Sequence, residues 1–525
     1  MDFATVVRQS ARNFRSNTAV WFEGREASYA ELYDRACRLA AGLAQLGVQP
    51  QDRVAVLADN RFETVEIACA CALGNTPVAT LYTYYTGETN AYLLDHLDAR
   101  VLIVDARLLD RIEPWRAQLD GLQHVIVMGG EAPAGTIAYD DLLASAPATD
   151  PRREVRPDDV HIIRFSSGTT GRPKAMFHTV ERWMTYNHGW RWATPTIDER
   201  DSYLAAGSLA HLAVAYLWGM LACGASVSPM ASFDPARFAQ LVEERRATYA
   251  TMVPTMIAMT VEEPSAWERD LSSLRCLTYA GSPIASDTLT RAIELFGDCL
   301  HQMYAQSEVA PVAMLLPHQH RPNGSEAERR RLRSVGRAQP MVEISIVDDD
   351  GKPVPDGEIG EVAVRSPGAM SGIWNDPDAT AERLLPDGSV LTRDMGRLDE
   401  DGFLYLADRK DDMIITGGYN VWPLELEEAL LSHAAVADAC VIGVPDPRWG
   451  ETPKAVVVLD PGATIDPATL QDELVALTRE KAGPVKKVTS VEIVDALPRS
   501  ATGKLQRSVV REPYWADATT RVGGA

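Results

Sequence analysis

The strongest constraint on the fold is a regular alternation of helical and strand patterns in the first part of the chain. Apolar residues recur at three- and four-residue spacing over residues 28–48 and 61–75, which is the period of an amphipathic helix. Short apolar runs bounded by turn residues lie between and after these segments, at 52–58, 76–81, 100–105 and 124–129. Strands that alternate with helices form parallel sheets covered by helices on both faces, so we predict an α/β fold.

The pattern changes in the second half of the chain. A strand, a helix and a strand are predicted at 271–281, 284–297 and 300–308. Residues 342–366 then show short alternating runs between Asp-Gly turns, which predict a β-rich module. Two later helical patterns, at 424–433 and 469–483, belong to a new α+β segment.

A chain of 525 residues exceeds the size of a single hydrophobic core, so it should form more than one domain. We predict a large N-terminal domain, residues 1–410, with two parallel-type αβ sheet subdomains and the β-rich module. A small, mobile α+β C-terminal domain, residues 411–525, should follow.

Charge and cysteine content exclude several functional classes. The formal net charge is −22, which argues against a nucleic-acid partner. The basic run at 327–337 is interpreted as a solvated surface segment, and residues 317–331 as an exposed loop. Seven cysteines without a C-x-x-C pair predict free thiols in a reducing compartment. The first 17 residues contain no apolar signal core, so we expect a cytoplasmic location.

One apolar stretch raises the question of a membrane span. Residues 202–233 contain no Asp, Glu, Lys or Arg. The dense apolar part, 209–225, is shorter than the roughly 20 residues that a span needs, and it contains His211. We therefore predict a buried helix over 209–222 beside an apolar cavity, and no transmembrane segment.

The loop sequence RFSSGTTGRPKAM, residues 164–176, has a composition suited to phosphate binding. Small residues let backbone amides turn toward an anion, hydroxyl groups add donors, and Lys174 adds a positive charge. The spacing differs from the G-x-x-x-x-G-K-[ST] loop, because Arg-Pro separates the last glycine from the lysine. Taken alone, the loop could also be a flexible surface segment.

Five further motifs decide between these interpretations. They are YAGSPI at 279–284, YAQSE at 304–308, TRDMG at 392–396, DRKDDMIITGGYNVWPLELE at 408–427 and PRSATGKLQR at 498–507. With the SSGTTGRPK loop they resemble, in order, the motifs of the adenylate-forming superfamily, which includes acyl-CoA synthetases. In that family the second and third of these read Y-G-x-T-E and T-G-D-x-G.

The resemblance implies a reaction in two steps. A carboxylate attacks the α-phosphate of ATP to give acyl-AMP and pyrophosphate, and a thiol then displaces AMP to give a thioester. Both reactants of the first step are anions, so neutralisation of charge should dominate catalysis.

The resemblance also assigns roles to residues. Catalysis would involve Lys504, Glu308, Lys174 and His211, and Mg²⁺ would be held by Glu308 with a loop hydroxyl such as Thr169. ATP and AMP would be bound by Ser166, Ser167, Gly168, Thr169, Thr170, Gly171, Lys174, Gly281, Ser282, Pro283, Tyr304, Ala305, Gln306, Ser307, Asp394, Arg409 and Lys504. Asp411 would be a hinge about which the small domain rotates, and CoA would meet Gly417, Gly418, Trp449 and Lys487.

The chain departs from the family pattern at several positions. Ala305 and Ser307 replace the glycine and threonine of Y-G-x-T-E, and Ala175 replaces the usual glycine after the loop lysine. His211 is kept, in SLAH in place of P-x-x-H. In relatives this histidine gates the acyl site or the thiol tunnel, whereas a single histidine in an apolar stretch is often a core residue.

The predicted acyl pocket is apolar. The resemblance places His211, Tyr216, Trp218, Gly281 and Ala305 there, and the helical segment 209–222 offers no carboxylate to pair with an amino group. An amino-acid substrate is therefore disfavoured, because an unpaired buried ammonium is costly. A fatty, aryl or polycyclic carboxylic acid suits this lining.

The expected function is an AMP-forming acid–CoA ligase that uses ATP, Mg²⁺ and CoA. Two alternatives remain: an enzyme that passes the acyl group to a carrier protein, and a catalytically silent paralogue that binds a ligand. A homodimer is left open.

Overall fold

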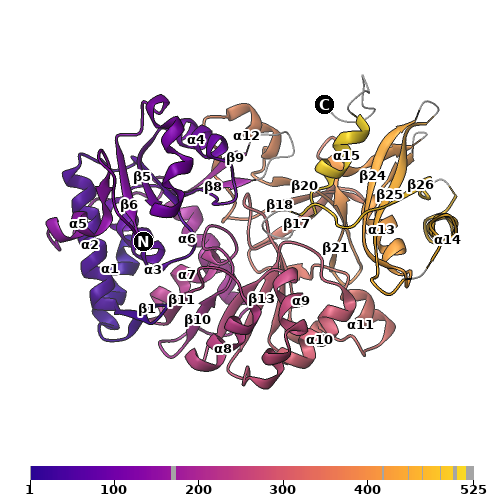
Figure 1. Cartoon of the computed structure of the whole chain (residues 1–525), viewed down its shortest axis with the longest axis horizontal. Coiled ribbons are helices and arrows are strands. Elements are labelled where there is room, and N and C mark those ends of the chain that lie inside the picture. Colours follow the sequence, from indigo (N-terminus) through magenta and orange to yellow (C-terminus); the bar gives the residue numbers. More distant parts are fainter. Residues whose placement is uncertain are drawn as a thin grey trace. The chain divides into compact units, whose positions relative to one another are not determined.

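In the computed structural model, residues 2–166, 173–416, 419–446, 449–463, 465–484, 486–499 and 505–515 are described (Figure 1). The chain divides into two compact units. The first comprises residues 1–344 and 364–390, and the second comprises 345–363 and 391–525. The domain boundary predicted between residues 410 and 411 stays a prediction.

The first unit is built on two large mixed sheets. The nine-stranded sheet has the order β16-β15-β14-β13-β12-β10-β11-β1-β2, and its neighbours from β14 to β1 are parallel. Its strands are β1 (Thr18–Phe22), β2 (Arg25–Ser28), β10 (Ser202–Ala205), β11 (Ser226–Pro229), β12 (Tyr249–Met252), β13 (Cys276–Ala280), β14 (Leu300–Tyr304), β15 (Ala313–Leu315) and β16 (Arg337–Ala338).

The eight-stranded sheet has the order β19-β9-β8-β4-β3-β5-β6-β7 and is parallel from β8 to β7. Its strands are β3 (Arg53–Leu57), β4 (Val78–Thr80), β5 (Ala99–Asp105), β6 (His124–Met128), β7 (Ile137–Ala138), β8 (Val160–Ser166), β9 (Lys174–Thr179) and β19 (Gly372–Ile373). The predicted α/β class and its parallel sheets are thus confirmed.

Helices pack on both sheets and contribute to their apolar cores (Figure 1). For example, the Ser28 and Glu31 side chains form a capping box at the start of α2, and its apolar face buries Leu32, Leu39 and Leu43. The α-helices of this unit are α1 (Phe3–Asn13), α2 (Tyr29–Gln45), α3 (Phe62–Gly74), α4 (Gly87–His96), α5 (Tyr139–Ser145), α6 (Val180–Gly189), α7 (Val214–Ala222), α8 (Pro235–Arg245), α9 (Pro254–Glu262), α10 (Ser286–Phe296), α11 (Glu326–Arg331) and α12 (Pro377–Arg383).

The second unit contains most of a four-stranded sheet and all of a five-stranded one. The four-stranded sheet consists of β17 (Glu343–Val347), β18 (Gly360–Arg365), β20 (Val390–Leu398) and β21 (Leu404–Arg409). The five-stranded sheet consists of β22 (Ile414–Thr416), β23 (Tyr419–Val421), β24 (Val436–Asp446), β25 (Gly450–Leu459) and β26 (Ser490–Ile493), and the helices are α13 (Pro423–Leu431), α14 (Pro467–Ala482) and α15 (Arg507–Trp515).

Two predictions on local structure were wrong in part. The helix expected over 209–222 begins only at Val214, because the Leu209 and Ala210 amides bond to the side chains of Asn60 and Ser208 and form a turn. The expected loop at 317–331 contains α11 and a buried His320, which bonds to the Tyr279 hydroxyl at 2.9 Å.

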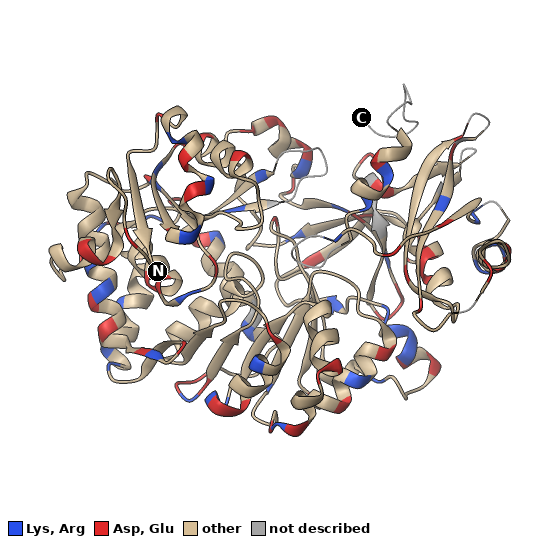
Figure 2. Cartoon of the chain, viewed as in Figure 1, with Lys and Arg blue, Asp and Glu red and all other residues tan. Residues whose placement is uncertain are grey.

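The basic run at 327–337 lies largely on the surface, and Figure 2 shows basic residues on α11. All seven cysteines are free thiols, and six of them are buried. No helix in the described part of the chain is long and apolar enough to cross a membrane.

Candidate active site

Two neighbouring strands bring the predicted adenine-side motifs to one edge of the nine-stranded sheet. β13 and β14 are parallel, with Ala280 opposite Met303, so Gly281 and Tyr304 follow at the same carboxyl edge. Gly281 has φ +102°, a conformation that glycine adopts without steric cost. Ser282 and Pro283 continue from it, and Ala305, Gln306 and Ser307 continue from Tyr304. The structure thus brings these two motifs together, at the kind of edge where α/β sheets bind ligands.

Glu308 is a buried carboxylate just beyond this edge. The residue is 8% exposed, and its carbonyl oxygen accepts a hydrogen bond from the Met370 amide at 2.7 Å. Its Oε1 lies 3.3 Å from Nη2 of Arg383, the last residue of α12. Arg383 lies in none of the sequence motifs, so sequence analysis missed this partner.

The base of the phosphate loop is a β-hairpin in the eight-stranded sheet. β8 and β9 are antiparallel, and the backbone of Ser166 lies opposite that of Lys174. The hairpin therefore starts and ends the loop at one point of the sheet edge. The predicted ligands Ser167, Gly168, Thr169, Thr170 and Gly171 lie outside the described residues.

The residues expected at the ribose also lie together. In the second unit the backbone of Asp394 in β20 pairs with that of Arg409 in β21. Asp394 is 6% exposed, and its amide donates to Oγ1 of Thr392 at 3.1 Å. Arg393, in the place of the glycine of T-G-D-x-G, has φ +61°. Sequence analysis did not recognise this departure.

The predicted hinge residue lies between two anchored neighbours. Asp411 belongs to a 3₁₀ turn, Lys410–Asp412. The Lys410 Nζ lies 3.0 Å from Glu361 of β18, and Oδ2 of Asp412 lies 3.0 Å from Nη1 of Arg507. The backbone on each side of Asp411 is therefore held by an ion pair.

Only some of the residues predicted to bind CoA lie in the described part of the chain. Trp449 is 48% exposed, and its amide donates to Oδ1 of Asp446 at 2.9 Å. Lys487 is half-buried, and the neighbouring Lys486 pairs with Glu425 at 2.9 Å. Gly417, Gly418 and Lys504 lie outside the described residues.

His211 packs in a cluster of aromatic rings. Its ring stacks on Tyr82 with 4.0 Å between centroids and 24° between planes. The Tyr84 ring lies 5.2 Å from that of Tyr82 and 6.4 Å from that of His211. Burial raises the pKa of the Tyr82 hydroxyl, which donates to the carbonyl of Phe165 at 2.7 Å. Tyr82 thus connects His211, the predicted gate, to the end of β8 just before the phosphate loop. No sequence motif indicated Tyr82.

Helix α7 presents two of the predicted pocket residues in different directions. The Tyr216 hydroxyl lies 2.7 Å from Oγ1 of Thr278 on β13, on the side of the nine-stranded sheet. Trp218 instead packs against Phe3, with 4.5 Å between ring centroids, and it lines a cavity next to β8. Residues two apart on a helix differ by about 200° in direction, so Tyr216 and Trp218 point to different sides of α7.

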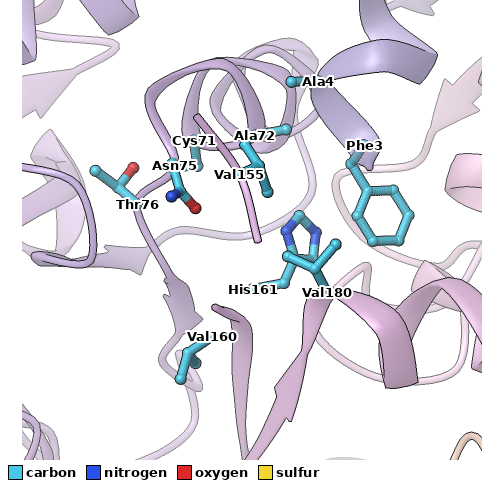
Figure 3. Close-up of a pocket in the computed structure, with 10 residues that line it drawn as sticks. All are labelled: Phe3, Ala4, Cys71, Ala72, Asn75, Thr76, Val155, Val160, His161 and Val180. Carbon is cyan, nitrogen blue, oxygen red and sulfur yellow. The ribbon is translucent and has the colours of Figure 1, made fainter. Parts of the chain in front are cut away.

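A second, small cavity lies next to the first. Figure 3 shows its lining, in which the ring of His161 lies beside Val180 and Phe3. The His161 and Phe3 rings stack at 4.2 Å. Because His161 lines both cavities, it forms part of the wall between them.

The features described so far are those of an adenylate-forming enzyme: two parallel-type α/β sheets, a glycine at a shared strand edge, a hairpin that carries the phosphate-type loop sequence, and a second unit with α+β structure. The sequence model of the AMP-binding enzyme family matches residues 7–374, and that of the AMP-binding enzyme C-terminal domain matches 425–504. The chain belongs to this family, and it is an AMP-forming ligase. The predicted membership of the superfamily is confirmed.

Three similar proteins show how relatives differ. The medium/long-chain-fatty-acid–CoA ligase FadD8 of Mycobacterium tuberculosis is 33% identical, over 94% of this chain and 86% of that protein. The fatty acid–[acyl-carrier-protein] ligase ScoC of Streptomyces coeruleorubidus is 30% identical, over 98% and 96%. The structure of the amide bond synthetase McbA from Marinactinospora thermotolerans superimposes with a TM-score of 0.87 at 30% identity, and it covers 98% of this chain and 99% of that one.

Proposed function

We propose that the protein activates an apolar carboxylic acid with ATP to acyl-AMP and pyrophosphate, and then transfers the acyl group to CoA with release of AMP. The observation that supports this most directly is the shared strand edge of Gly281 and Tyr304, with the buried Glu308 beyond it. A nucleotide bound there would meet backbone on one side and a carboxylate on the other.

Mg²⁺ suits the surroundings of Glu308. One carboxylate oxygen lies 3.3 Å from Arg383, which leaves the second oxygen for a ligand. A single protein carboxylate is typical of a cation that arrives on ATP with phosphate and water ligands. When bound, Mg²⁺ would neutralise charge on the phosphates. Arg383 would hold the Glu308 carboxylate in place, and Thr169 is the proposed second ligand.

An apolar acyl group is favoured by the lining near the strand edge. Ala305 packs against a buried cluster that includes Tyr216, Ala280 and Met303. The methyl group of Ala305 would limit the depth of the pocket where the family has glycine. Burial raises the pKa of Tyr216, so its hydroxyl stays neutral and offers no charge to a substrate.

The acceptor of the acyl group is not fixed by the comparisons, because similar proteins are named for different acceptors. FadD8 is named for CoA, ScoC for acyl-carrier protein and McbA for amide bonds. The resemblance to CoA-using members of the superfamily at Trp449 and Gly450 favours CoA. Transfer to a carrier protein is the second candidate, and the similarity to ScoC favours it.

A pyrophosphate-release screen tests the proposal. A panel of fatty, aryl and polycyclic acids, with amino acids as controls, is incubated with ATP and Mg²⁺. Each acid that releases pyrophosphate is then offered CoA, a carrier protein or an amine. AMP and an acyl-CoA thioester support the proposal. Pyrophosphate without acyl-CoA favours another acceptor, and no release with any acid contradicts the proposed activity.

A further inference from the structure

Arg164 is a buried arginine without a carboxylate. It lies on β8 and is 7% exposed. Its Nη1 donates to the Tyr186 hydroxyl at 3.2 Å, and its Nε has no hydrogen-bond partner. It forms no ion pair with any residue in the described ranges. The Trp183 and Tyr186 rings lie 5.5 and 5.7 Å from its guanidinium, but these faces carry no net charge.

Three other arginines, whose side chains are 12–18% exposed, are paired with carboxylates. Arg61 lies 2.8 Å from Asp105, Arg507 lies 2.8 Å from Glu427, and Arg383 lies 3.3 Å from Glu308. An unpaired buried charge is expensive, so proteins normally provide a counter-charge. At Arg164 no described residue provides that counter-charge.

Arg164 lines the cavity that also holds Trp218. The rest of the lining is largely apolar and comes from β3, β4, β8, α3, α7 and the turn before α7: Val56, Thr64, Ile67, Ala68, Val78, Thr80, His161, Ile162, Ile163, Leu209, Ala210, Val214 and Leu217. An apolar cavity with a few polar groups is the usual form of a small-molecule site.

His161 is a second polar group in this cavity. It is 6% exposed, and burial lowers its pKa to about 3, so the ring is neutral. Its nitrogens form no hydrogen bond within the described part of the chain. A neutral imidazole can donate one hydrogen bond and accept one. The cavity therefore has a charged donor and a neutral partner available to a ligand.

This cavity differs from the predicted acyl pocket. Val214, Leu217 and Trp218 face it from one side of α7, whereas Tyr216 bonds to Thr278 on the opposite side. A guanidinium pairs best with a carboxylate, and the apolar walls suit a hydrocarbon group. We infer that the Arg164 cavity is a second binding site, for the carboxylate of an apolar monocarboxylic acid.

The ligand has two possible sources: the acid that the enzyme activates, or a different apolar acid that acts as an effector. The inference does not depend on the proposed reaction, because it rests on Arg164 and its surroundings. Decanoate is a suitable probe, with its methyl ester as the uncharged control.

The test is a calorimetric titration with the catalytic site blocked. The full chain is saturated with decanoyl-sulfamoyl-adenosine, an unreactive analogue of acyl-AMP, and is then titrated with decanoate. We expect one further equivalent to bind. Arg164→Gln should weaken this binding at least about tenfold, the scale of one charge-assisted interaction. Methyl decanoate should bind weakly and equally to both proteins. Arg200→Gln, which removes an exposed charge paired with Asp198, is the matched control and should bind like wild type.

A second variant covers a failure of Arg164→Gln to fold. Leu217→Trp keeps the charge but fills the cavity from α7, and it should also lose decanoate binding. The inference is overturned if no second equivalent binds, or if both variants bind decanoate as wild type does. It is also overturned if Arg164→Gln raises the KM for ATP while decanoate binding is unchanged, because Arg164 would then serve the nucleotide.

Two comparisons show whether the bound acid is the substrate or an effector. If only acids that are turned over bind the blocked enzyme, the ligand is the substrate acid. If acids that are not turned over also bind and change kcat, the ligand is an effector. If the blocking analogue fails to bind, that result counts against the proposed function, and the dependence of decanoate binding on Arg164 still decides this inference.

Discussion

Arg507 shows how single residues could position the C-terminal lysine motif. Its guanidinium bonds to both carboxylate oxygens of Glu427, at 2.8 and 2.9 Å, and to Asp412 at 3.0 Å. Two residues before it, Leu505 pairs with Arg499 in an antiparallel bridge. The chain on the C-terminal side of Lys504 is therefore fixed to a core helix and to the residue after the predicted hinge.

Lys504→Ala should lower acyl-adenylate formation by about a hundredfold, the scale of losing one preorganised charge-stabilising group. Thioester formation from supplied acyl-AMP should change much less, since Lys504 would act only in the first step. Pyrophosphate exchange and single-turnover transfer measure the two steps. Lys481 is an exposed residue of α14 that bonds to the Ser432 hydroxyl. Lys481→Ala is the control and should leave both steps unchanged. An equal fall in both steps would show that the assigned role is wrong.

The buried His161 should give an acid-dependent loss of stability. Burial holds its pKa at about 3 in the folded protein, against 6.5 ordinarily, so the unfolded chain takes up a proton first as the pH falls. Above pH 6.5 both states are neutral at His161, and the free energy of unfolding is not reduced. As the pH falls from 6.5 toward 3, proton uptake by the unfolded chain lowers the free energy of unfolding progressively. In the wild type, this proton uptake should lower the free energy of unfolding by about 2 kcal/mol between pH 6.5 and 5, at roughly 1.4 kcal/mol per proton and pH unit. His161→Phe should not show this decrease.

Urea unfolding of the wild type and of His161→Phe, from pH 8 to pH 5, checks this prediction. The difference in unfolding free energy should be constant above pH 7.5 and should shift in favour of the variant below pH 6.5. Parallel curves over the whole range would mean that His161 does not titrate as its burial implies.

At the scale of elements, the edge of the nine-stranded sheet depends on one glycine. Gly336 has φ +87°, and a Cβ there would lie 1.9 Å from the carbonyl carbon of Met314 in β15. It precedes β16, which pairs with β15, and β15 pairs with the strand that carries Tyr304. Gly357 has a similar φ of +85° but no atom within 4 Å of such a Cβ.

Gly336→Ala should therefore destabilise the protein by several kcal/mol, because backbone has to move. Gly357→Ala should cost only about 1–2 kcal/mol, the penalty of a left-handed conformation for a residue with a Cβ. Thermal unfolding of the two variants compares them directly. An equal loss of stability in the two variants would mean that the contact with Met314 is relieved at little cost.

Residues within short sequence motifs could be predicted, whereas contacts between distant segments could not. Gly281 and Tyr304 were found because each lies in a short motif that resembles one of the family, and the parallel strands β13 and β14 bring the two motifs to one edge. Arg383 and Tyr82 were missed because their partners, Glu308 and His211, are distant in sequence and no spacing reports them. The start of α7 was misplaced because a side chain 149 positions away, Asn60, bonds to Leu209.

At the scale of the whole molecule, the predicted alternation between half-reactions requires a point where the chain can turn. The 3₁₀ turn Lys410–Asp412 has the features of such a point. Lys410 is held by Glu361 at 3.0 Å and by Asp349 at 2.8 Å, and Asp412 is held by Arg507 at 3.0 Å. With both neighbours fixed, a change of φ and ψ would concentrate at Asp411.

Asp411→Pro tests this hinge. Residues of 3₁₀ turns have φ between about −50° and −70°, which proline also adopts, so the variant should fold and keep the present backbone. It should no longer make the change of φ that a second orientation of the small domain needs. We expect the orientation for adenylation to survive, so pyrophosphate exchange should persist while thioester formation from CoA collapses. Both half-reactions are measured, with a melting curve as control. Loss of both with a lower Tm would indicate damage to folding, and unchanged thioester formation would remove Asp411 from the mechanism.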